Sequence, residues 1–309
     1  MNLKLKLTLP LLVALAYAPN PAWAVLLLGS DVASFAALGA STVTNIPTSV
    51  IVGNVGVSAG TAITGFSTTS GSAVADSQVT SGLVHSNTAI AAAGQSQLTT
   101  ARSNFASLGT GTILAADLAG LTLTPGIYTV TAGTTNLSGT VTLDGLGNPN
   151  AFWLFQMPST LITSSGSVVN VINAGSGAGV FWNVGSSATL DTTTSFEGNI
   201  LALTSITLNT GATIGCGRAL ADTGAVTMDQ NTINAITCAG TGEEGSIGLS
   251  GGGLDFVPGG GTGGSVVETG TGTVVSVPGH VVPAPGTLAL VGLGLVGLLG
   301  SRRKSLTVA

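Results

Sequence analysis

The sequence predicts a mostly β fold, a β-solenoid of short strands, together with one α-helix. Short runs of Val, Ile, Leu and Thr are separated by Gly, Pro and Ser along the body of the chain, which is typical of many short strands in one domain. Short motifs in the second half recur at a period of about 19 residues, which suits a coil of three strands. One Ala-rich and Gln-rich stretch instead spaces its larger apolar residues like an amphipathic helix.

The N-terminal residues predict a cleaved secretion signal over residues 1–24. Two lysines precede a short apolar stretch, and the small-residue pattern Ala22-Trp23-Ala24 follows it. Cleavage there makes Val25 the first residue of the mature chain. A membrane anchor is the alternative, but the apolar stretch is shorter than the roughly 20 residues that a spanning helix needs.

The mature body carries almost no positive charge. Between Val25 and Val282 it has two arginines, Arg102 and Arg218, and no lysine, which excludes a surface for nucleic acid. Apolar residues are plentiful enough for the body to fold despite its low charge. We therefore predict one domain over residues 25–240, with a neutral surface rich in hydroxyl groups.

The two cysteines, Cys216 and Cys238, are expected to form a disulfide because the chain is exported. In the chain-entropy model such a bond contributes about 3 kcal/mol. A metal pair is the alternative, but His85 is far away in the sequence and His280 lies in a linker. We predict no metal site and no cofactor.

The elements follow in order along the chain. Short strands are expected from Gly29 to Phe66. Residues 72–108 predict one amphipathic helix that Gly109 ends. From Leu121 to Leu143 apolar residues alternate with Thr, which predicts strands with one buried face and one hydroxyl-bearing face.

The repeats lie in the second half. The tetrapeptides Ser187-Ala-Thr-Leu190, Ser205-Ile-Thr-Leu208 and Ala225-Val-Thr-Met228 follow one another at nearly equal intervals, and Gly198 to Ala202 returns at a similar interval as Gly217 to Ala221. Stacked coils place equivalent strand positions about 4.8 Å apart, so a lattice of Thr is expected on at least one flat side.

The C-terminal part changes character. Residues 241–282 are rich in Gly, Ser and Thr and predict a flexible linker. A tail over residues 283–309 follows, with a short apolar segment at 287–300 that we predict to be transmembrane, although its length is marginal. The basic cluster Arg302-Arg303-Lys304 would lie on the cytoplasmic side.

The stretch from Val282 to Lys304 resembles a PEP-CTERM sorting signal. That resemblance implies processing by an exosortase in a Gram-negative bacterium. Ala284 stands where the motif has an acidic residue, so anchored and released forms both stay open, and a plain C-terminal anchor is the alternative. The two ends together predict a secreted or cell-surface protein.

Seven segments of the body resemble the DUF3494 family of ice-binding proteins, in the same order and over Val25 to about Cys238. The resemblance implies a discontinuous, right-handed β-solenoid of triangular section with one long α-helix packed alongside. It also implies a monomer whose partner is the ice surface, with thermal hysteresis and inhibition of ice recrystallisation as its activity. The segments are Thr44 to Ser49, Gly53 to Val57, Ile63 to Phe66, Asp117 to Tyr128, Val180 to Gly185, Phe196 to Ala202 and Leu208 to Thr213.

Threonine is suited to an ice-binding face because one stiff side chain supplies a methyl group that orders water and a hydroxyl that anchors it. Some members of that family carry Thr-Ala/Gly-x-Thr/Asn motifs, and this sequence has the pattern three times, with Asn136 as a further candidate. Threonine also suits any strand, so a decorated solenoid without function is the alternative. The candidate ice-binding residues are Thr61, Thr64, Thr131, Thr134, Asn136, Thr210 and Thr213.

Catalysis is not expected. The acidic residues are scattered, several stand in turns, and none belongs to a set of nucleophile, base and orienting group. The rival to ice binding is a non-catalytic adhesin or structural protein of the cell surface that binds extracellular polysaccharide. The acidic residues concerned are Asp144, Asp191, Glu197, Asp222 and Asp229.

Overall fold

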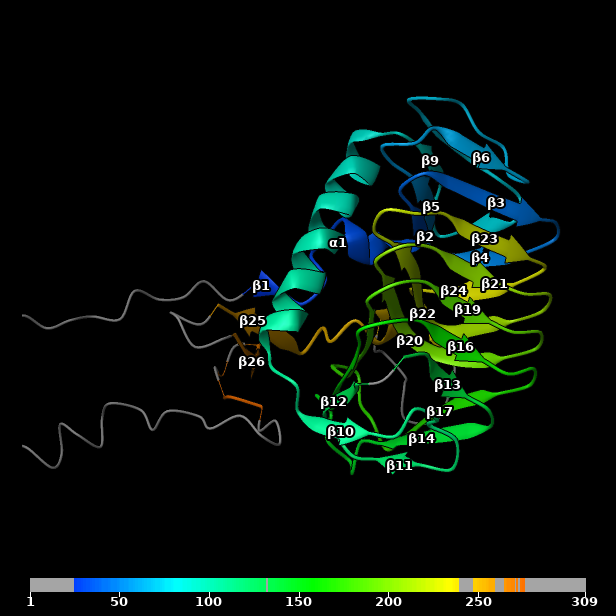
Figure 1. Cartoon of the computed structure of the whole chain (residues 1–309). Helices are drawn as coiled ribbons and strands as arrows, with labels where there is room; N and C mark the ends of the chain where they lie inside the picture. Colours follow the sequence, from blue (N-terminus) through cyan, green and yellow to red (C-terminus); the bar gives the residue numbers. More distant parts are fainter. Residues whose placement is uncertain are drawn as a thin grey trace, which may run out of the picture.

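The computed structural model describes residues 25–131, 133–238, 247–258, 264–269, 271 and 273–275. This part of the chain is mostly β, as predicted, with one α-helix, α1 (Ala89–Ser107), and two short 3-10 helices, η1 (Val32–Ser34) and η2 (Ile247–Leu249) (Figure 1). No helix in the described part is long and apolar enough to cross a membrane. The predicted signal at 1–24 and the tail at 283–309 lie outside the described residues.

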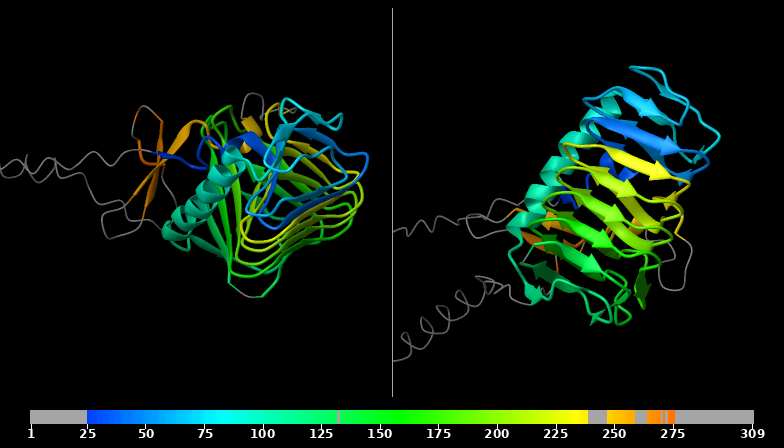
Figure 2. Two further views of the ribbon diagram at one scale, coloured as in Figure 1. Left: turned by 90° about the horizontal axis from the view of Figure 1, so that it is seen from above. Right: turned by 45° about the vertical axis from the view of Figure 1, so that its right-hand side comes forward.

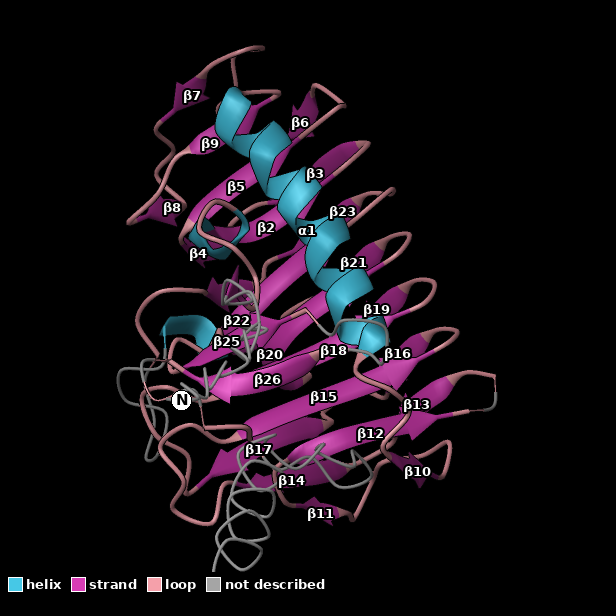
Figure 3. Ribbon diagram, turned by 90° about the vertical axis from the view of Figure 1, so that its left-hand side faces the viewer, coloured by secondary structure: helices cyan, strands magenta, loops and turns pink. Residues whose placement is uncertain are grey.

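Most strands belong to a stack of coils in which neighbouring coils pair in parallel. Each coil passes through three strand directions before the next coil begins, so the strands form three faces (Figure 2). We name these the helix face, the threonine face and the third face. α1 lies across the helix face, as Figure 3 shows, and leaves the threonine face and the third face uncovered.

The helix face, in stack order, consists of β10 (Thr112–Leu114), β12 (Gly126–Val130), β15 (Phe152–Met157), β18 (Gly179–Val184), β20 (Ser195–Ala202), β22 (Thr213–Ala221), β2 (Phe35–Gly39), β5 (Asn54–Val57), β9 (Val84–Ser86) and the antiparallel β7 (Ala73–Val74). The threonine face consists of β13 (Thr135–Leu137), β16 (Leu161–Thr163), β19 (Ala188–Leu190), β21 (Ile206–Leu208), β23 (Val226–Asp229), β3 (Thr42–Ile46) and β6 (Ala62–Thr64). The third face consists of β11 (Thr122–Leu123), β14 (Thr140–Asp144), β17 (Val168–Ile172), the first residues of β20 and β22, β24 (Thr232–Asn234), β4 (Val50–Val52) and β8 (Val79–Thr80).

The order of the coils is not the order of the chain. β2 lies between β22 and β5, so the first coil of the chain stacks on the last one. The same junction joins β23 to β3 and β24 to β4 on the other two faces. The N-terminal and C-terminal coils therefore meet inside the stack.

The predicted repeats are stacked on one another. Thr189 pairs with Thr207, and Thr207 pairs with Thr227, so the three tetrapeptides occupy the same position in successive coils. Gly198 pairs with Gly217 in the same way, and both have positive φ values, 100° and 153°. A side chain on Gly217 would collide with the carbonyl of Gly198, which explains why the repeat keeps glycine there.

The interior of the stack is closely packed with apolar and aromatic residues. Tyr128, Phe155 and Trp182 occupy paired positions in successive coils, and the ring centroids of Phe155 and Trp182 are 4.0 Å apart and nearly parallel. Trp182 also contacts Phe196, with centroids 5.0 Å apart. Such contacts stabilise the stack beyond the burial of apolar area.

α1 begins at Ala89, later than the residue 72 that we predicted. Residues 73–86 instead form β7, β8 and β9, because Val79 and Val84 are buried in ladders with Ile51 and Val55. The Thr88 hydroxyl caps the helix by accepting a hydrogen bond from the backbone N–H of Ala91. The predicted end near residue 108 agrees with the structure.

One face of α1 is buried against the helix face and forms a second core with it. The buried positions recur every three or four residues, which is the spacing of one helix face. Gly94 lets the helix approach β2 closely, because an added side chain would lie 3.2 Å from the Phe35 ring. The buried residues of α1 are Ala91, Gly94, Leu98, Ala101 and Phe105.

Part of the predicted flexible linker is folded, which corrects that expectation. β25 (Leu254–Val257) pairs antiparallel with β1 (Val25–Leu26) on one side and with β26 (Ser265–Glu268) on the other. Leu254, Phe256 and Val266 are buried in the second core. Burial of these few apolar residues stabilises the segment, although its overall composition is rich in glycine. We call residues 247–258 and 264–268 the C-terminal clasp.

Arg218 connects the clasp to the first coil of the chain and to the last one. Its side chain is fully buried, and its guanidinium donates to the carbonyl oxygens of Ala33 (2.7 Å), Ala235 (3.0 Å) and Gly248 (2.9 Å) and to Oδ1 of Asn199 (2.8 Å). Burial lowers the pKa of Arg218 to about 9, so the group is still charged at neutral pH. Five donors in a fixed plane suit this set of acceptors.

The predicted disulfide is present between Cys216 and Cys238, whose Cα atoms are 5.1 Å apart. It ties β22 to the chain that follows β24. No group of three or more His, Cys, Asp or Glu residues in the described part could hold a metal ion.

Arg218→Met is expected to lower the free energy of unfolding by on the order of 3 kcal/mol, because it leaves several buried carbonyls without a donor. Urea unfolding followed by circular dichroism measures the change. Arg218→Lys keeps the charge but not the planar set of donors, so it should recover only part of the loss. An unchanged urea midpoint for Arg218→Met would show that the buried network contributes nothing.

Candidate functional site

The threonine face presents straight rows of outward side chains, because each pair of neighbouring strands is in parallel register. Its central row begins with Asp117, Asn136 and Ile162 and continues with five consecutive threonines. Adjacent strands lie about 4.8 Å apart, so these side chains repeat at about that spacing. We call the five the threonine ladder; in stack order they are Thr189, Thr207, Thr227, Thr44 and Thr64.

The hydroxyl groups of the ladder have no partners within the described part of the protein. None of the five side chains takes part in a hydrogen bond there, whereas other threonines do. Thr163, for example, shares a buried hydrogen bond of 2.7 Å with Thr194 and accepts another from the backbone of Asp191. The ladder hydroxyls are therefore free to bond to water or to a solid outside the protein.

The ladder is held rigidly from below. Ile206 and Leu208 flank Thr207 in β21, and both are buried in the interior of the stack. A β-branched side chain on a strand has few rotamers, and the dense interior fixes the backbone that carries it. The methyl and hydroxyl groups thus form a regular and stiff surface.

Two charges near the ladder stand at one border of the threonine face, and a third, Asp117, stands at the end of the central row beyond Asn136. The Asp191 carboxylate accepts from the Asn209 amide (3.0 Å) and from the backbone N–H of Thr192 (2.7 Å), and these bonds lower the pKa of Asp191. The Thr210 hydroxyl donates to Asp229 at the same border. On the other border the outward positions are neutral, and they include Ser187 and Ser205.

The structure separates the seven residues that the motifs predicted. Thr64 belongs to the ladder, Asn136 lies in the same row between Asp117 and Ile162, and Thr134 stands just before β13 with its hydroxyl accepting from Thr160 (3.0 Å). Thr213 lies on the third face, paired with Ser195 and Thr232. Thr61, Thr131 and Thr210 lie in the turns between faces.

Four ladder residues were not predicted as site residues. Thr189, Thr207 and Thr227 are the third residues of the repeated tetrapeptides, so the period of the repeats could have identified them. Thr44 could not be found in that way. It joins the ladder because β3 stacks on β23, which lies near the other end of the folded chain.

The third face is less regular. Its row through Thr122, Thr142 and Asn170 reaches a register shift in the pairing of β20 with β22, where Glu197 stands. Its neighbouring row contains Val168 and Val50 among hydroxyl residues. Neither row has more than two threonines in succession.

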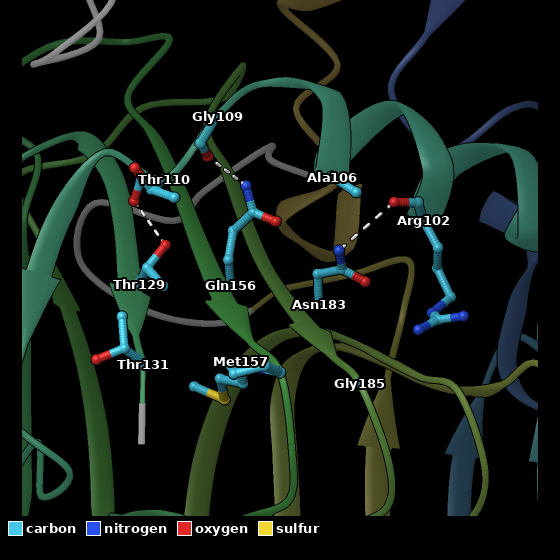
Figure 4. A pocket seen from close by; sticks show the side chains of 11 residues that line it. Arg102, Ala106, Gly109, Thr110, Thr129, Thr131, Gln156, Met157, Asn183 and Gly185 are labelled. Atoms are coloured by element: carbon cyan, nitrogen blue, oxygen red, sulfur yellow. Dashed lines mark hydrogen bonds between the residues drawn. The ribbon is translucent and has the colours of Figure 1, made fainter. Parts of the chain in front are cut away.

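A cavity of about 460 Å³ lies at the C-terminal end of α1, beside the helix face (Figure 4). The side-chain amides of Gln156 and Asn183 line it and donate to backbone carbonyls of Gly109 and Arg102, so they attach the helix to the strands. Thr131 also lines the cavity, away from the threonine face.

The acidic residues considered for catalysis lie apart from one another. Asp144, the last residue of β14, accepts from Asn173 (2.9 Å), and Asp222 forms an ion pair of 2.8 Å with Arg102. Glu197 lies on the third face, and the two remaining residues stand at the border of the threonine face. The structure assembles no pair of carboxylates around a cavity among these five.

A stack of parallel coils with a regular row of threonine hydroxyls on one exposed face defines a class of repetitive, coil-stacked proteins. Residues 37–234 match the family described as ice-binding-like, and residues 281–304 match the PEP-CTERM protein-sorting motif. The chain belongs to the ice-binding-like family. Both predicted resemblances are thereby confirmed, although the sorting motif lies outside the described residues.

Named relatives agree with this family. An ice-binding protein of Nostoc sp. (strain HG1) is 48% identical over 202 residues, which is 65% of this chain and 71% of that protein. An ice-binding protein of Flavobacterium frigoris (strain PS1) is 38% identical over 130 residues, or 42% of this chain and 44% of that protein.

Solved structures are similar over the coil stack. The ice-binding protein of the Antarctic ascomycete Antarctomyces psychrotrophicus has a TM-score of 0.59 at 34% identity, and the match covers 68% of this chain and 98% of that one. An ice-binding protein with antifreeze activity from an Arctic yeast has a TM-score of 0.60 at 28% identity, with 68% and 94% covered.

Thr207→Val is expected to leave the free energy of unfolding nearly unchanged, because the hydroxyl that it removes has no partner inside the described part of the protein. Thr163→Val removes a buried hydroxyl with two partners and should cost about 1–3 kcal/mol. Thermal and urea unfolding of the two variants give the comparison. Equal losses for both would mean that the ladder hydroxyls have a structural role.

Proposed function

We propose that this protein is an extracellular ice-binding protein that adsorbs to ice through the threonine face and thereby gives thermal hysteresis and inhibits ice recrystallisation. The observation that carries the proposal is the ladder of five threonines in register with unpartnered hydroxyls. The relatives named above, which are ice-binding proteins, support the same activity.

The physical basis is the mixture of groups at a regular spacing. The methyl groups favour ordered water over them, and the hydroxyls hold that water at fixed points. Asp191 and Asp229 keep their hydration shells at the border, away from the centre of the face. Water over the ladder can therefore take an ordered arrangement that joins the crystal.

The finer features of the protein extend this proposal. The first coil stacked on the last supports a discontinuous β-solenoid, and we assign to it the right-handed winding and triangular section that the resemblance implies. The match to a sorting motif supports export by a Gram-negative bacterium and processing by an exosortase. Adsorption through one exposed face needs only a monomer and no catalytic group.

Among the predicted site residues, we assign ice contact to Thr64 and, on the other side of the ladder in the same row, to Asn136. Thr134 would contact ice from the neighbouring row. The comparisons give no support to the adhesin alternative, since the relatives they name are ice-binding proteins.

Thr207→Tyr is expected to abolish most of the thermal hysteresis, because a ring at the centre of the ladder holds ice away from its neighbours. The matched control is Thr142→Tyr, which places the same ring on a strand of the third face. Nanolitre osmometry with circular dichroism on both variants tests the assignment. If only Thr142→Tyr loses activity while both remain folded, the ice-binding surface is the third face.

Ile162→Thr should raise thermal hysteresis, because Ile162 is 42% exposed and continues the row next to Thr189. The substitution lengthens the run of threonines from five to six without changing the strand. Leu203→Thr, at an exposed position in a turn, is the control for a general gain of hydroxyl groups. If Ile162→Thr and the unmodified protein give equal thermal hysteresis, the length of the ladder does not determine the activity.

A further inference from the structure

The C-terminal clasp determines on which side of the folded body the described part of the chain ends. β25 and β26 cover the same core as α1, and Figure 1 shows them on the side of the molecule away from β16, β19, β21 and β23 of the threonine face. The last described residues stay attached to the clasp. The backbone N–H of Val275 donates to the carbonyl of Val266 (3.0 Å), and Val274 forms an antiparallel β-bridge with Val267.

The clasp is bound to the body by several independent contacts. Gly251 N–H donates to the Ala178 carbonyl (2.9 Å), and the Asn199 amide donates to the Leu249 carbonyl (2.9 Å). Leu249 is fully buried in the main core, and Leu254 is fully buried in the second core. Release of the clasp would expose both residues and the unpaired edge of β1.

The clasp leaves a short connection to the sorting motif. The matched motif begins at residue 281 and the last described residue is 275, so only the stretch 276–280 lies between them. Six backbone steps span at most about 20 Å, whereas the full stretch 241–282, if extended, would span about 140 Å. The clasp therefore reduces the reach of the tether severalfold.

We infer that the clasp orients the protein when it is held through its C-terminal tail, so that the helix face is next to the holding surface and the threonine face points to the outside. This inference rests on the proposed function, because it concerns the direction in which the ice-binding face is presented. In this orientation the surface that holds the tail lies beside the clasp, and ice contacts the opposite side of the protein.

Coupling to beads at two alternative positions tests the inference. In the full chain, Val281→Cys supplies a thiol at the start of the sorting motif, and Thr207→Cys supplies one on the ladder, while the native cysteines are joined in a disulfide. Beads coupled at residue 281 should be taken into a growing ice front. Beads coupled at residue 207 should be excluded from it because the bead covers the ladder, and uptake of the uncoupled Val281→Cys variant is checked first.

The outcomes separate the two proposals. If the free chain is excluded from ice, the proposed function fails. If the free chain is taken up but beads coupled at residue 281 are excluded, or if both kinds of bead behave alike, the inferred orientation is wrong. Hydrogen exchange of the free chain tests the clasp without ice: amides of β25 should exchange as slowly as those of β18, and fast exchange in β25 overturns the inference.

Discussion

Parallel pairing in register between neighbouring coils is the constraint on which the rest of this structure depends. Because each coil repeats the position of its neighbour, a residue that recurs in the sequence recurs in space at the spacing between strands. The outward rows become the threonine ladder, and the inward rows become the aromatic stack of Tyr128, Phe155 and Trp182. A shift of one residue in any pair would turn hydroxyls inward and apolar groups outward.

The three faces divide the tasks of the protein. The helix face is covered by α1 and the C-terminal clasp, and so contributes a second core. The third face closes each coil but has no long regular row. The threonine face is open, neutral at its centre and backed by buried residues. The covered face and the open face are thus different sides of one repeating unit, and Arg218 connects the coils at the point where the chain order is interrupted.

Much of this arrangement could be predicted from local sequence patterns. The period of the repeats, the disulfide and the end of α1 were predicted because each depends on residues close together in the chain. The start of the helix was misplaced, since Val79 and Leu83 have helical spacing but Val79 is buried by pairing with Ile51 in an earlier strand. The clasp was missed because its few apolar residues stand in short runs among many glycines, which gave the segment the composition of a linker.

The site shows the same division. The tetrapeptide repeats mark Thr189, Thr207 and Thr227 as equivalent, yet the choice of an ice-binding motif directed attention to turns such as Thr61 and Thr131. Only a knowledge of which coil stacks on which adds Thr44 and Thr64 to the same row. The stacking order of the coils depends on the burial of whole coils, so it cannot be predicted from a short segment.

The insertion of β2 between β22 and β5 has a consequence for how the chain reaches its final state. One side of β2 is without its strand partner until residues 213–221 are available, so the contacts that complete the stack join residues from opposite ends of the folded body. Contacts so distant form late, because the intervening chain must first be brought together. A polypeptide that threads through a membrane N-terminus first would therefore remain incompletely assembled during passage, and the junction of its two end coils would close only on the far side.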